Sequence, residues 1–461
     1  MKLLKNNNIY LLAIVLAILL NVFSWQLPFF WDTILTSTIT QHFYEHGFQG
    51  FITPAQLDAG HPPLFYIYVT CFYYLFEKTL LAAHVSMLPF TILGIVSFIS
   101  LLQHFSFSKA QQVTGVLLYL AIPTVITQNT MVSYDAVSLS LYLAALSAYL
   151  KNYKMVFAFV VFGMLGITLR GLFCVASLSA TIFFTENKQF KAWFRWNVLF
   201  APAIVIAFAW YIYHYTQTGW LFATKAEAWT EQRGLADAMG LLKNGFSIAR
   251  CFFDLGILIL TSLSLFYVIQ KRKVDTYTLL WLIPAMIFSV SFLPFTNPIN
   301  HRYFLIVYVL MLFPVLLFLA ERKRVYTVFT TLILLLGHFQ IYPVPISNGW
   351  DCTLAHLSYL KDKKTMLAFY DNFKQLNKNN IGTVFPMNAS LYQTDMLDDT
   401  VRMFNVNGKS IDSVPYILYS NVGNDFSDKQ IKELEKWTPR TIRGGVLTQM
   451  ILFENPALSS K

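Results

Sequence analysis

The chain has 461 residues, of which 56% are hydrophobic and only 13% are charged. Soluble domains carry about 25% charged residues, so this composition excludes an ordinary soluble protein and indicates one that crosses a membrane several times. The net charge of +10 does not indicate a nucleic-acid-binding protein, because the clustered positive charges lie in short loops between apolar segments.

Eleven apolar segments are candidate membrane spans, and no internal repeat or low-complexity stretch accompanies them. Several have only about 14–17 residues, at or below the usual length of a complete span. No small-residue cleavage site follows the first segment, so we expect it to remain as a span. The candidates lie near residues 9–30, 83–104, 113–130, 136–150, 155–168, 171–184, 197–215, 251–269, 277–295, 303–320 and 325–342.

Segment 62–76 decides the predicted topology. If it does not cross the membrane, every later cluster of Lys and Arg falls on the same side as the N-terminus, as the positive-inside rule favours. We therefore expect this segment to form a helix that lies along the outer membrane interface. That location suits its tyrosines, which are Tyr66, Tyr68, Tyr73 and Tyr74. The N-terminus is then cytoplasmic and the C-terminal region extracytoplasmic. The basic clusters are Lys2 and Lys5, Lys109, Lys151 and Lys154, Lys188, Lys191 and Arg195, Lys271 to Lys273, and Arg322 to Arg324.

The sequence predicts two domains. Residues 1–342 form a transmembrane domain in which 31–82 is a long first outer loop with interfacial helices. Residues 343–461 are more polar and are numerous enough for a small α/β domain. In that domain Ser427 and Gln430 have the spacing of a capping box. The expected elements are helices Thr353–Asn377 and Lys429–Trp437 and strands Gly382–Phe385, Tyr416–Tyr419 and Gly445–Phe453.

Two carboxylates stand at the outer ends of candidate spans. Asp32 follows Phe29-Phe30-Trp31, and a carboxylate shielded by aromatic rings can act as a general base. The alternatives for Asp32 are a carboxylate at a helix end in the membrane interface and an N-cap of the helix Thr33–Tyr44. Asp135 lies in a tight outer turn, where it either caps the span 136–150 or faces the same cavity as Asp32.

Several cationic side chains are predicted on the same outer side. Arg170 is a single cation between two apolar segments, which is a costly placement. It either binds an anionic partner such as a lipid phosphate or extends to the lipid headgroups. His301 and Arg302 add cationic capacity in the last outer loop. His61 stands in a rigid corner with Pro62 and Pro63, where it is either structural or a ligand of phosphate or metal. The four cysteines show no CxxC spacing, so neither a metal cluster nor a redox pair is predicted.

In combination these motifs resemble the GT-C glycosyltransferase superfamily, above all its bacterial branch related to protein O-mannosyltransferases and to the lipid A aminoarabinose transferase. The resemblance covers about residues 1–320. Thr33 follows the first acid where an acidic pair is often seen, and His61 stands where the lipid A enzymes carry Lys. The matching residues are Asp32, then Pro62-Pro63-Leu64, then Asp135, then Arg170-Gly171, then His301-Arg302-Tyr303.

This resemblance implies an all-α polytopic membrane protein of the GT-C type in the cytoplasmic (inner) membrane of a bacterium. It implies an inverting glycosyltransferase that uses a polyprenyl-phosphate-linked sugar, with undecaprenyl phosphate as the expected carrier. The acceptor is a hydroxyl of a lipid, a glycan or a protein, and membrane lipids are further partners. No cofactor is assigned, and a divalent metal ion is left open.

The same resemblance assigns roles to the residues. Asp32 is the expected base, and Asp135 positions the acceptor or orients a basic partner. Arg170 and Arg302 are the main candidates for binding the donor phosphate, and His61 and His301 are further candidates for it.

Two other classes of function remain open from the sequence. A lipid-linked-sugar flippase or transporter is one, although transporters place their charges within spans and are built from repeats. A non-catalytic membrane scaffold with a partner-binding tail is the other. The scaffold predicts that substitutions of Asp32 and Arg170 are harmless whereas deletion of the tail is not.

Overall fold

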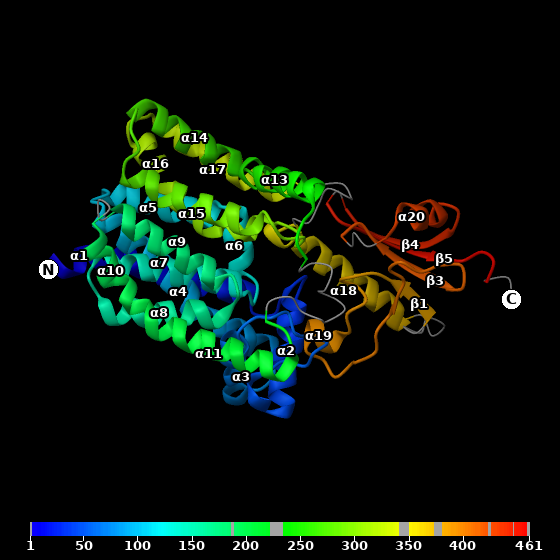
Figure 1. Cartoon of the computed structure of the whole chain (residues 1–461). Coiled ribbons are helices and arrows are strands. Elements are labelled where there is room, and N and C mark those ends of the chain that lie inside the picture. Colours follow the sequence, from blue (N-terminus) through cyan, green and yellow to red (C-terminus); the bar gives the residue numbers. More distant parts are fainter. Residues whose placement is uncertain are drawn as a thin grey trace. The chain divides into compact units, whose positions relative to one another are not determined.

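The structure, a computed structural model, describes residues 2–185, 189–221, 234–340, 350–372, 380–422, 426–445 and 447–458 (Figure 1). The chain divides into two compact units. The first comprises Met1–Trp25 and Ile39–His338, and the second comprises Gln26–Thr38 and Phe339–Lys461. The segment that carries Asp32 therefore groups with the C-terminal part of the chain, which sequence reasoning did not anticipate.

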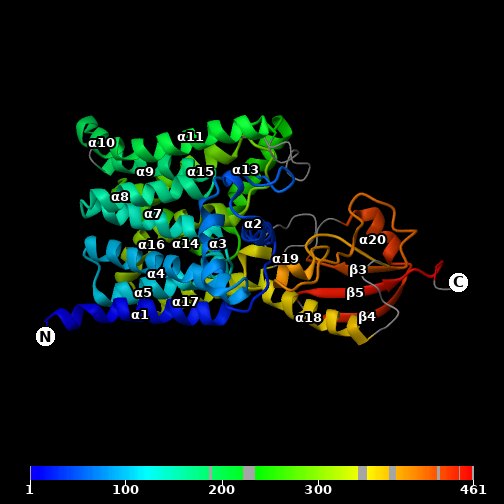
Figure 2. The same ribbon diagram turned by 90° about the horizontal axis from the view of Figure 1, so that it is seen from below.

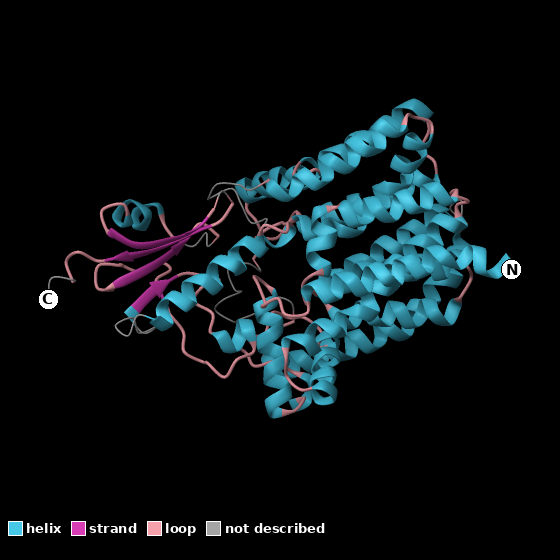
Figure 3. Cartoon of the chain, turned by 180° about the vertical axis from the view of Figure 1, so that it is seen from behind, coloured by secondary structure: helices cyan, strands magenta, loops and turns pink. Residues whose placement is uncertain are grey.

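The first unit is helical, and its long helices run side by side (Figure 3). Every predicted apolar segment overlaps one of these helices. Segment 62–76 forms α3, and the boundary between the units falls within α2 (Thr33–His46). The other helices are α1 (Lys2–Ser24), α3 (Leu64–Phe76), α4 (Leu80–His104), α5 (Lys109–Ala121), α6 (Pro123–Asn129), α7 (Tyr134–Leu150), α8 (Lys154–Ile167), α9 (Gly171–Thr185), α10 (Phe190–Asn197), α11 (Ala201–Thr218), α13 (Ala238–Phe253), α14 (Ile257–Lys271), α15 (Thr276–Phe292), α16 (Leu305–Ala320) and α17 (Arg324–Leu336).

By length and composition, three helical segments of the described chain can cross a membrane alone: Leu80–His104, Phe190–Thr218 and His301–Ala320. The number rises to five if each of two bent pairs is one span. The pairs are α5 with α6, which meet at 74°, and α13 with α14, which meet at 85°. The remaining apolar helices are shorter, so the eleven spans stay a prediction.

Helices α7 and α16 form the centre of the first unit. Nearly all residues of α16 are buried, and it is apolar on every side, as expected of a helix enclosed by other helices. Helix α7 is likewise buried along most of its length. Asp135 lies in the first turn of α7, and Arg302 lies in the 3-10 turn His301–Phe304 that leads into α16. A charged residue thus lies in the first turn of α7, and another lies just before α16.

The second unit contains a five-stranded sheet with the order β2-β1-β3-β5-β4. Strand β1 pairs in parallel with β2 and β3. Strand β5 pairs antiparallel with β3 and β4, and Figure 2 shows β5 between these two strands. This agrees with the small α/β domain expected from the sequence. The strands are β1 (Ile381–Thr383), β2 (Phe404–Asn405), β3 (Tyr416–Ser420), β4 (Thr438–Gly444) and β5 (Gln449–Glu454), and the helices are α18 (His356–Asn372), α19 (Leu391–Asp395) and α20 (Asp428–Leu434).

The capping box at Ser427 is confirmed, because the Ser427 hydroxyl accepts from the Gln430 amide and the Gln430 side chain accepts from the Ser427 amide. Helix α20 ends at Leu434, before the expected Trp437. The expected helix Thr353–Asn377 begins at His356, and its last residues lie outside the described part of the chain. Strands β2 and β4 were not predicted, because neither contains a buried apolar residue.

The aromatic run before Asp32 packs inside the second unit. Phe29 and Phe30 are almost fully buried. The Phe29 amide donates to the Thr394 carbonyl at 2.7 Å, and the Phe30 ring lies 5.2 Å from that of Tyr359. These residues thus attach the segment Gln26–Thr38 to the C-terminal part of the second unit. An aromatic run in the sequence does not reveal whether it packs against protein or against the membrane interface.

Candidate functional site

One carboxylate joins two arginines in the first unit. Arg170 Nη1 lies 2.6 Å from Asp135 Oδ1, and Arg302 Nε lies 3.5 Å from Asp135 Oδ2. Arg170 comes from the turn between α8 and α9, so three separate parts of the chain meet here. The side chains of Asp135 and Arg302 are each only 7% exposed, and that of Arg170 is 16% exposed. We call these three residues the arginine cluster.

The arginine cluster carries one positive charge in excess, because two guanidinium groups surround one carboxylate. Charge that is shielded from water is costly unless an opposite charge balances it. The Tyr303 ring contributes part of the balance, since the guanidinium carbon of Arg170 lies 4.3 Å from its centre and that of Arg302 lies 5.3 Å from it. An anion bound here would therefore be stabilised, and guanidinium groups bind phosphate with two parallel hydrogen bonds.

The arginine cluster lines a pocket whose other walls are largely apolar. Its volume is only about 20 Å³, room for about one water molecule, so a phosphate could bind here only if the surrounding side chains moved apart. The pocket is lined by Asp135, Ser138, Arg170, Phe173, Cys174, Phe288, Phe292, Arg302, Tyr303, Leu305 and Ile306.

The N-cap of α7 is Ser133 and not Asp135, so the capping alternative for Asp135 is wrong. The Ser133 hydroxyl accepts from the Asp135 amide at 3.1 Å, and it donates to the Gln128 side chain. Because Ser133 satisfies the helix end, the Asp135 carboxylate can hold the two arginines.

His61 lies beside the arginine cluster without joining it directly. Its ring meets that of Tyr134 edge-on at 5.5 Å, and the Leu169 amide lies 3.5 Å from His61 Nδ1. Tyr134 and Leu169 immediately precede Asp135 and Arg170. The corner formed by Pro62 and Pro63 leads into α3, with Pro63 as its N-cap residue. The order of motifs along the sequence thus becomes proximity in space for His61, Asp135, Arg170 and Arg302.

His301 is turned toward a different carboxylate. It is fully buried, and its Nε2 lies 3.7 Å from Asp254 Oδ2. Arg250 Nε lies 3.4 Å from the same oxygen. Sequence reasoning missed Arg250 and Asp254, although charges four residues apart beside an apolar span are a signal that could have found them.

Asp32 lies in the second unit, half-buried, in the turn before α2. The Thr33 hydroxyl holds this turn: it donates to the Phe30 carbonyl at 2.7 Å and accepts from the Phe30 amide at 2.9 Å. Trp31 has a φ of 54°, in the left-handed region that a large aromatic residue rarely adopts. Such strain persists where the surrounding structure fixes it and gathers at functional sites.

A buried carboxylate–imidazole pair was not predicted. Asp58 Oδ2 lies 2.7 Å from His214 Nε2, and Asp58 Oδ1 accepts from the Gly60 amide at 2.8 Å. The other ring nitrogen of His214 lies 3.2 Å from the Trp220 carbonyl oxygen. The pair ties the loop that ends in the His61 corner to α11. A histidine within an apolar span is the signal that could have revealed it.

Metal ligands do not gather in the described residues, where no three His, Cys, Asp or Glu side chains form a group that could hold an ion. No disulfide joins the four cysteines, all of which belong to the described residues.

The glycine after Arg170 has a steric role that can be tested. A Cβ on Gly171 would lie 2.0 Å from the Met164 carbonyl oxygen, so Gly171→Ala must displace the turn that carries Arg170. We expect a loss of roughly 1–3 kcal/mol in stability, measured by thermal denaturation in detergent. Gly163→Ala is the control, because its Cβ would approach only a leucine side chain, at 3.3 Å. Equal melting temperatures for Gly171→Ala and wild type would contradict this role.

The Asp58–His214 pair gives a second prediction. Asp58→Ala leaves a buried imidazole without its carboxylate, which costs about 1–3 kcal/mol, so the melting temperature should fall. Glu321→Ala removes a carboxylate that lies 3.7 Å from Lys271 on the surface, where ion pairs contribute about 0–1 kcal/mol. The pair has no structural role if the two variants melt alike.

No family model matches the sequence, and no curated protein matches it. Two solved structures do resemble the chain, both of ArnT from Cupriavidus metallidurans. The form bound to undecaprenyl phosphate has a TM-score of 0.51 and the apo form 0.52. Each is 12% identical in sequence and aligns over 98% of this chain and 99% of its own. The chain therefore shares the fold of these two ArnT structures.

Proposed function

We propose that the protein is an integral-membrane glycosyltransferase that takes its sugar from a polyprenyl-phosphate-linked donor. The observation that carries this proposal is the arginine cluster, a site of excess positive charge with apolar walls, in a chain with the fold of ArnT. One of the two ArnT structures is bound to undecaprenyl phosphate. We place the protein in a bacterial inner membrane, with a cytoplasmic N-terminus and an extracytoplasmic second unit.

Arg170 and Arg302 hold the donor phosphate in this proposal. Their guanidinium groups can each form two hydrogen bonds to phosphate oxygens, and positive charge stabilises the phosphate as it leaves. Asp135 keeps the two cations at one place before the donor arrives. His61 supports the cluster through Tyr134 and Leu169, and His301 supports it through the turn that carries Arg302.

Asp32 serves as the general base. It accepts the proton of the acceptor hydroxyl while the hydroxyl oxygen forms a bond to the anomeric carbon of the donor sugar. The bond between that carbon and the phosphate oxygen breaks, and polyprenyl phosphate leaves with the electron pair. One displacement inverts the configuration of the anomeric carbon, with no covalent intermediate on the enzyme.

The phosphate-binding role predicts which variants lose the lipid. Arg302→Gln and Arg170→Gln should each weaken binding of undecaprenyl phosphate about 10-fold or more, because a hydrogen bond to a charged group contributes roughly 1.5–3 kcal/mol. Native mass spectrometry of the detergent-purified protein, titrated with the lipid, measures this. Arg322→Gln is the control, since Arg322 also packs on an aromatic ring but is exposed. Undiminished binding in both cluster variants would refute the assignment.

The base role predicts a different signature. Asp32→Asn should retain the lipid but transfer sugar at least ~100-fold more slowly, because a positioned base contributes about 10²–10⁴ in rate. Single-turnover transfer from a radiolabelled lipid-linked sugar measures the rate. Full activity in Asp32→Asn would show that another group takes the proton.

If lipid is translocated without sugar transfer, the flippase alternative replaces the enzyme. If the Asp32 and Arg170 variants are both neutral and only deletion of 339–461 impairs growth, the protein is a scaffold and not an enzyme.

A further inference from the structure

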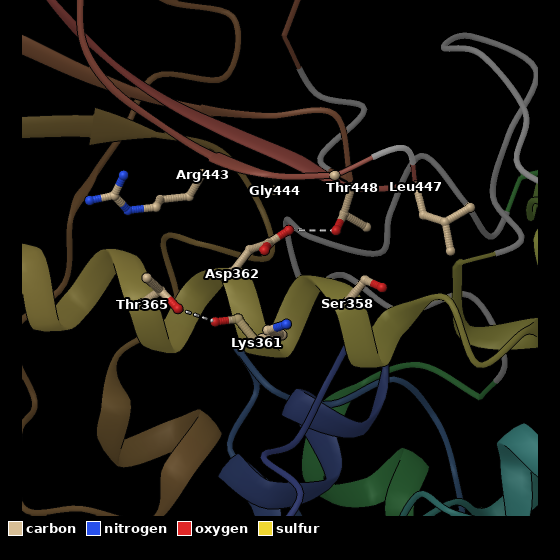
Figure 4. Close-up of a pocket in the computed structure, with 9 residues that line it drawn as sticks. Ser358, Lys361, Asp362, Thr365, Arg443, Gly444, Leu447 and Thr448 are labelled. Atoms are coloured by element: carbon tan, nitrogen blue, oxygen red, sulfur yellow. Dashed lines mark hydrogen bonds between the residues drawn. The ribbon is translucent and has the colours of Figure 1, made fainter.

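The second unit contains a cavity of about 380 Å³ between α18 and the hairpin of β4 and β5. This volume lies within the roughly 300–1,000 Å³ range of small-molecule sites. Figure 4 shows Asp362 of α18 and Thr448 of the hairpin pointing toward one another at the cavity. The lining residues are Ser358, Lys361, Asp362, Thr365, Arg443, Gly444, Gly445, Leu447 and Thr448.

The face of α18 that lines this cavity is polar. Ser358, Lys361, Asp362 and Thr365 recur at three- and four-residue intervals, the spacing of one helical face. Packing against a sheet ordinarily requires an apolar stripe there. Helix α18 has apolar side chains, but two of them, Tyr359 and Met366, are buried away from this lining. Of the four residues, Lys361 and Thr365 are exposed, as is usual for polar side chains on a helix surface, whereas Asp362 is buried.

Asp362 and Thr448 give the cavity a fixed hydrogen-bonding wall. Both residues are at least nine-tenths buried, and the Thr448 hydroxyl donates to Asp362 Oδ2 at 2.6 Å. A buried carboxylate has further lone pairs for the hydroxyl groups of a ligand. The glycines of the hairpin keep side chains out of the opening: a Cβ on Gly444 would lie 2.2 Å from the Thr448 carbonyl oxygen, and Gly445 faces open space.

The charges at the cavity favour an anion. Lys361 and Arg443 are cationic, and Asp362 is the one acidic residue of the lining. Within the described residues, neither Lys361 nor Arg443 lies within 4.0 Å of a carboxylate oxygen, whereas Lys363 on the same helix lies 2.9 Å from Asp395. The guanidinium carbon of Arg443 lies 5.7 Å from the centre of the Phe369 ring, one turn beyond Thr365. The cavity thus combines hydroxyl-binding groups with two cations that lack an acidic partner there.

We propose that this cavity binds a sugar that carries a negative charge. Asp362 and the hydroxyl groups of Ser358, Thr365 and Thr448 would bind the sugar hydroxyls, and Lys361 and Arg443 would bind its anionic group. If the proposed function holds, this is where the protein recognises a charged glycan acceptor; the binding itself does not depend on that function.

The test is ligand-observed saturation-transfer NMR on the full-length protein in detergent, without donor lipid. The probes are glucose 1-phosphate, glucuronate, neutral glucose and inorganic phosphate, since the anionic group can be a phosphate or a carboxylate. We expect at least one of the two anionic sugars to bind about 10-fold more tightly than both glucose and inorganic phosphate. If glucose binds as tightly as the anionic sugars, the role of charge is refuted. If inorganic phosphate binds as tightly as they do, the role of the sugar is refuted. If no probe binds, the site itself is refuted.

Variants of the lining residues test whether the sugar binds in this cavity. Lys361→Gln and Arg443→Gln should each weaken it about 10-fold, whereas Lys364→Gln, an exposed lysine of α18 outside the lining, should not. Equal melting temperatures confirm that the variants fold. Undiminished binding in both lining variants would overturn the proposal. Failure here leaves lipid binding by Arg170 and Arg302 untouched, so it is distinguishable from failure of the proposed function.

Discussion

The Asp135 carboxylate is the constraint on which the first unit depends. It lies within ion-pair distance of two arginines that are far apart in the sequence, and it thereby fixes where α7, the turn before α9 and the turn before α16 meet. Removing either arginine would take away one of the two ion pairs, and removing the carboxylate would leave two guanidinium groups facing one another. Removing one partner of a buried ion pair is strongly destabilising, because it leaves an uncompensated buried charge.

Sequence reasoning found the members of this cluster because each is a charge at the end of an apolar segment, a placement that needs a cause. It could not find the pairing. Asp135 and Arg302 are joined only by the packing of α7 against α16, and helix periodicity says nothing about which helices touch. The capping alternative for Asp135 failed for a local reason, since Ser133 two residues earlier satisfies the helix end. The buried Asp58–His214 pair escaped because neither residue belongs to a recognisable motif.

The second unit shows a different limit of the sequence. Phe29 and Phe30 have the composition of a membrane-interface anchor, yet they bury against Thr394 and Tyr359. The period of a short aromatic run does not distinguish lipid from protein as its surroundings. The capping box at Ser427 was predictable because its two hydrogen bonds are local. Strand β4 was not predictable. It is an edge strand, which needs few buried apolar residues, so its sequence resembles that of a loop.

In the proposed function the two units have separate tasks: the first binds the lipid phosphate at the arginine cluster, and the second carries Asp32 and a polar cavity. The most direct test is cryo-electron microscopy of the full-length protein in lipid nanodiscs containing undecaprenyl phosphate. The proposed function predicts density for the phosphate at the arginine cluster, with its oxygens about 2.7–3.2 Å from guanidinium nitrogens of Arg170 and Arg302. A phosphate bound elsewhere, while both arginines keep their ion pairs with Asp135, would contradict it.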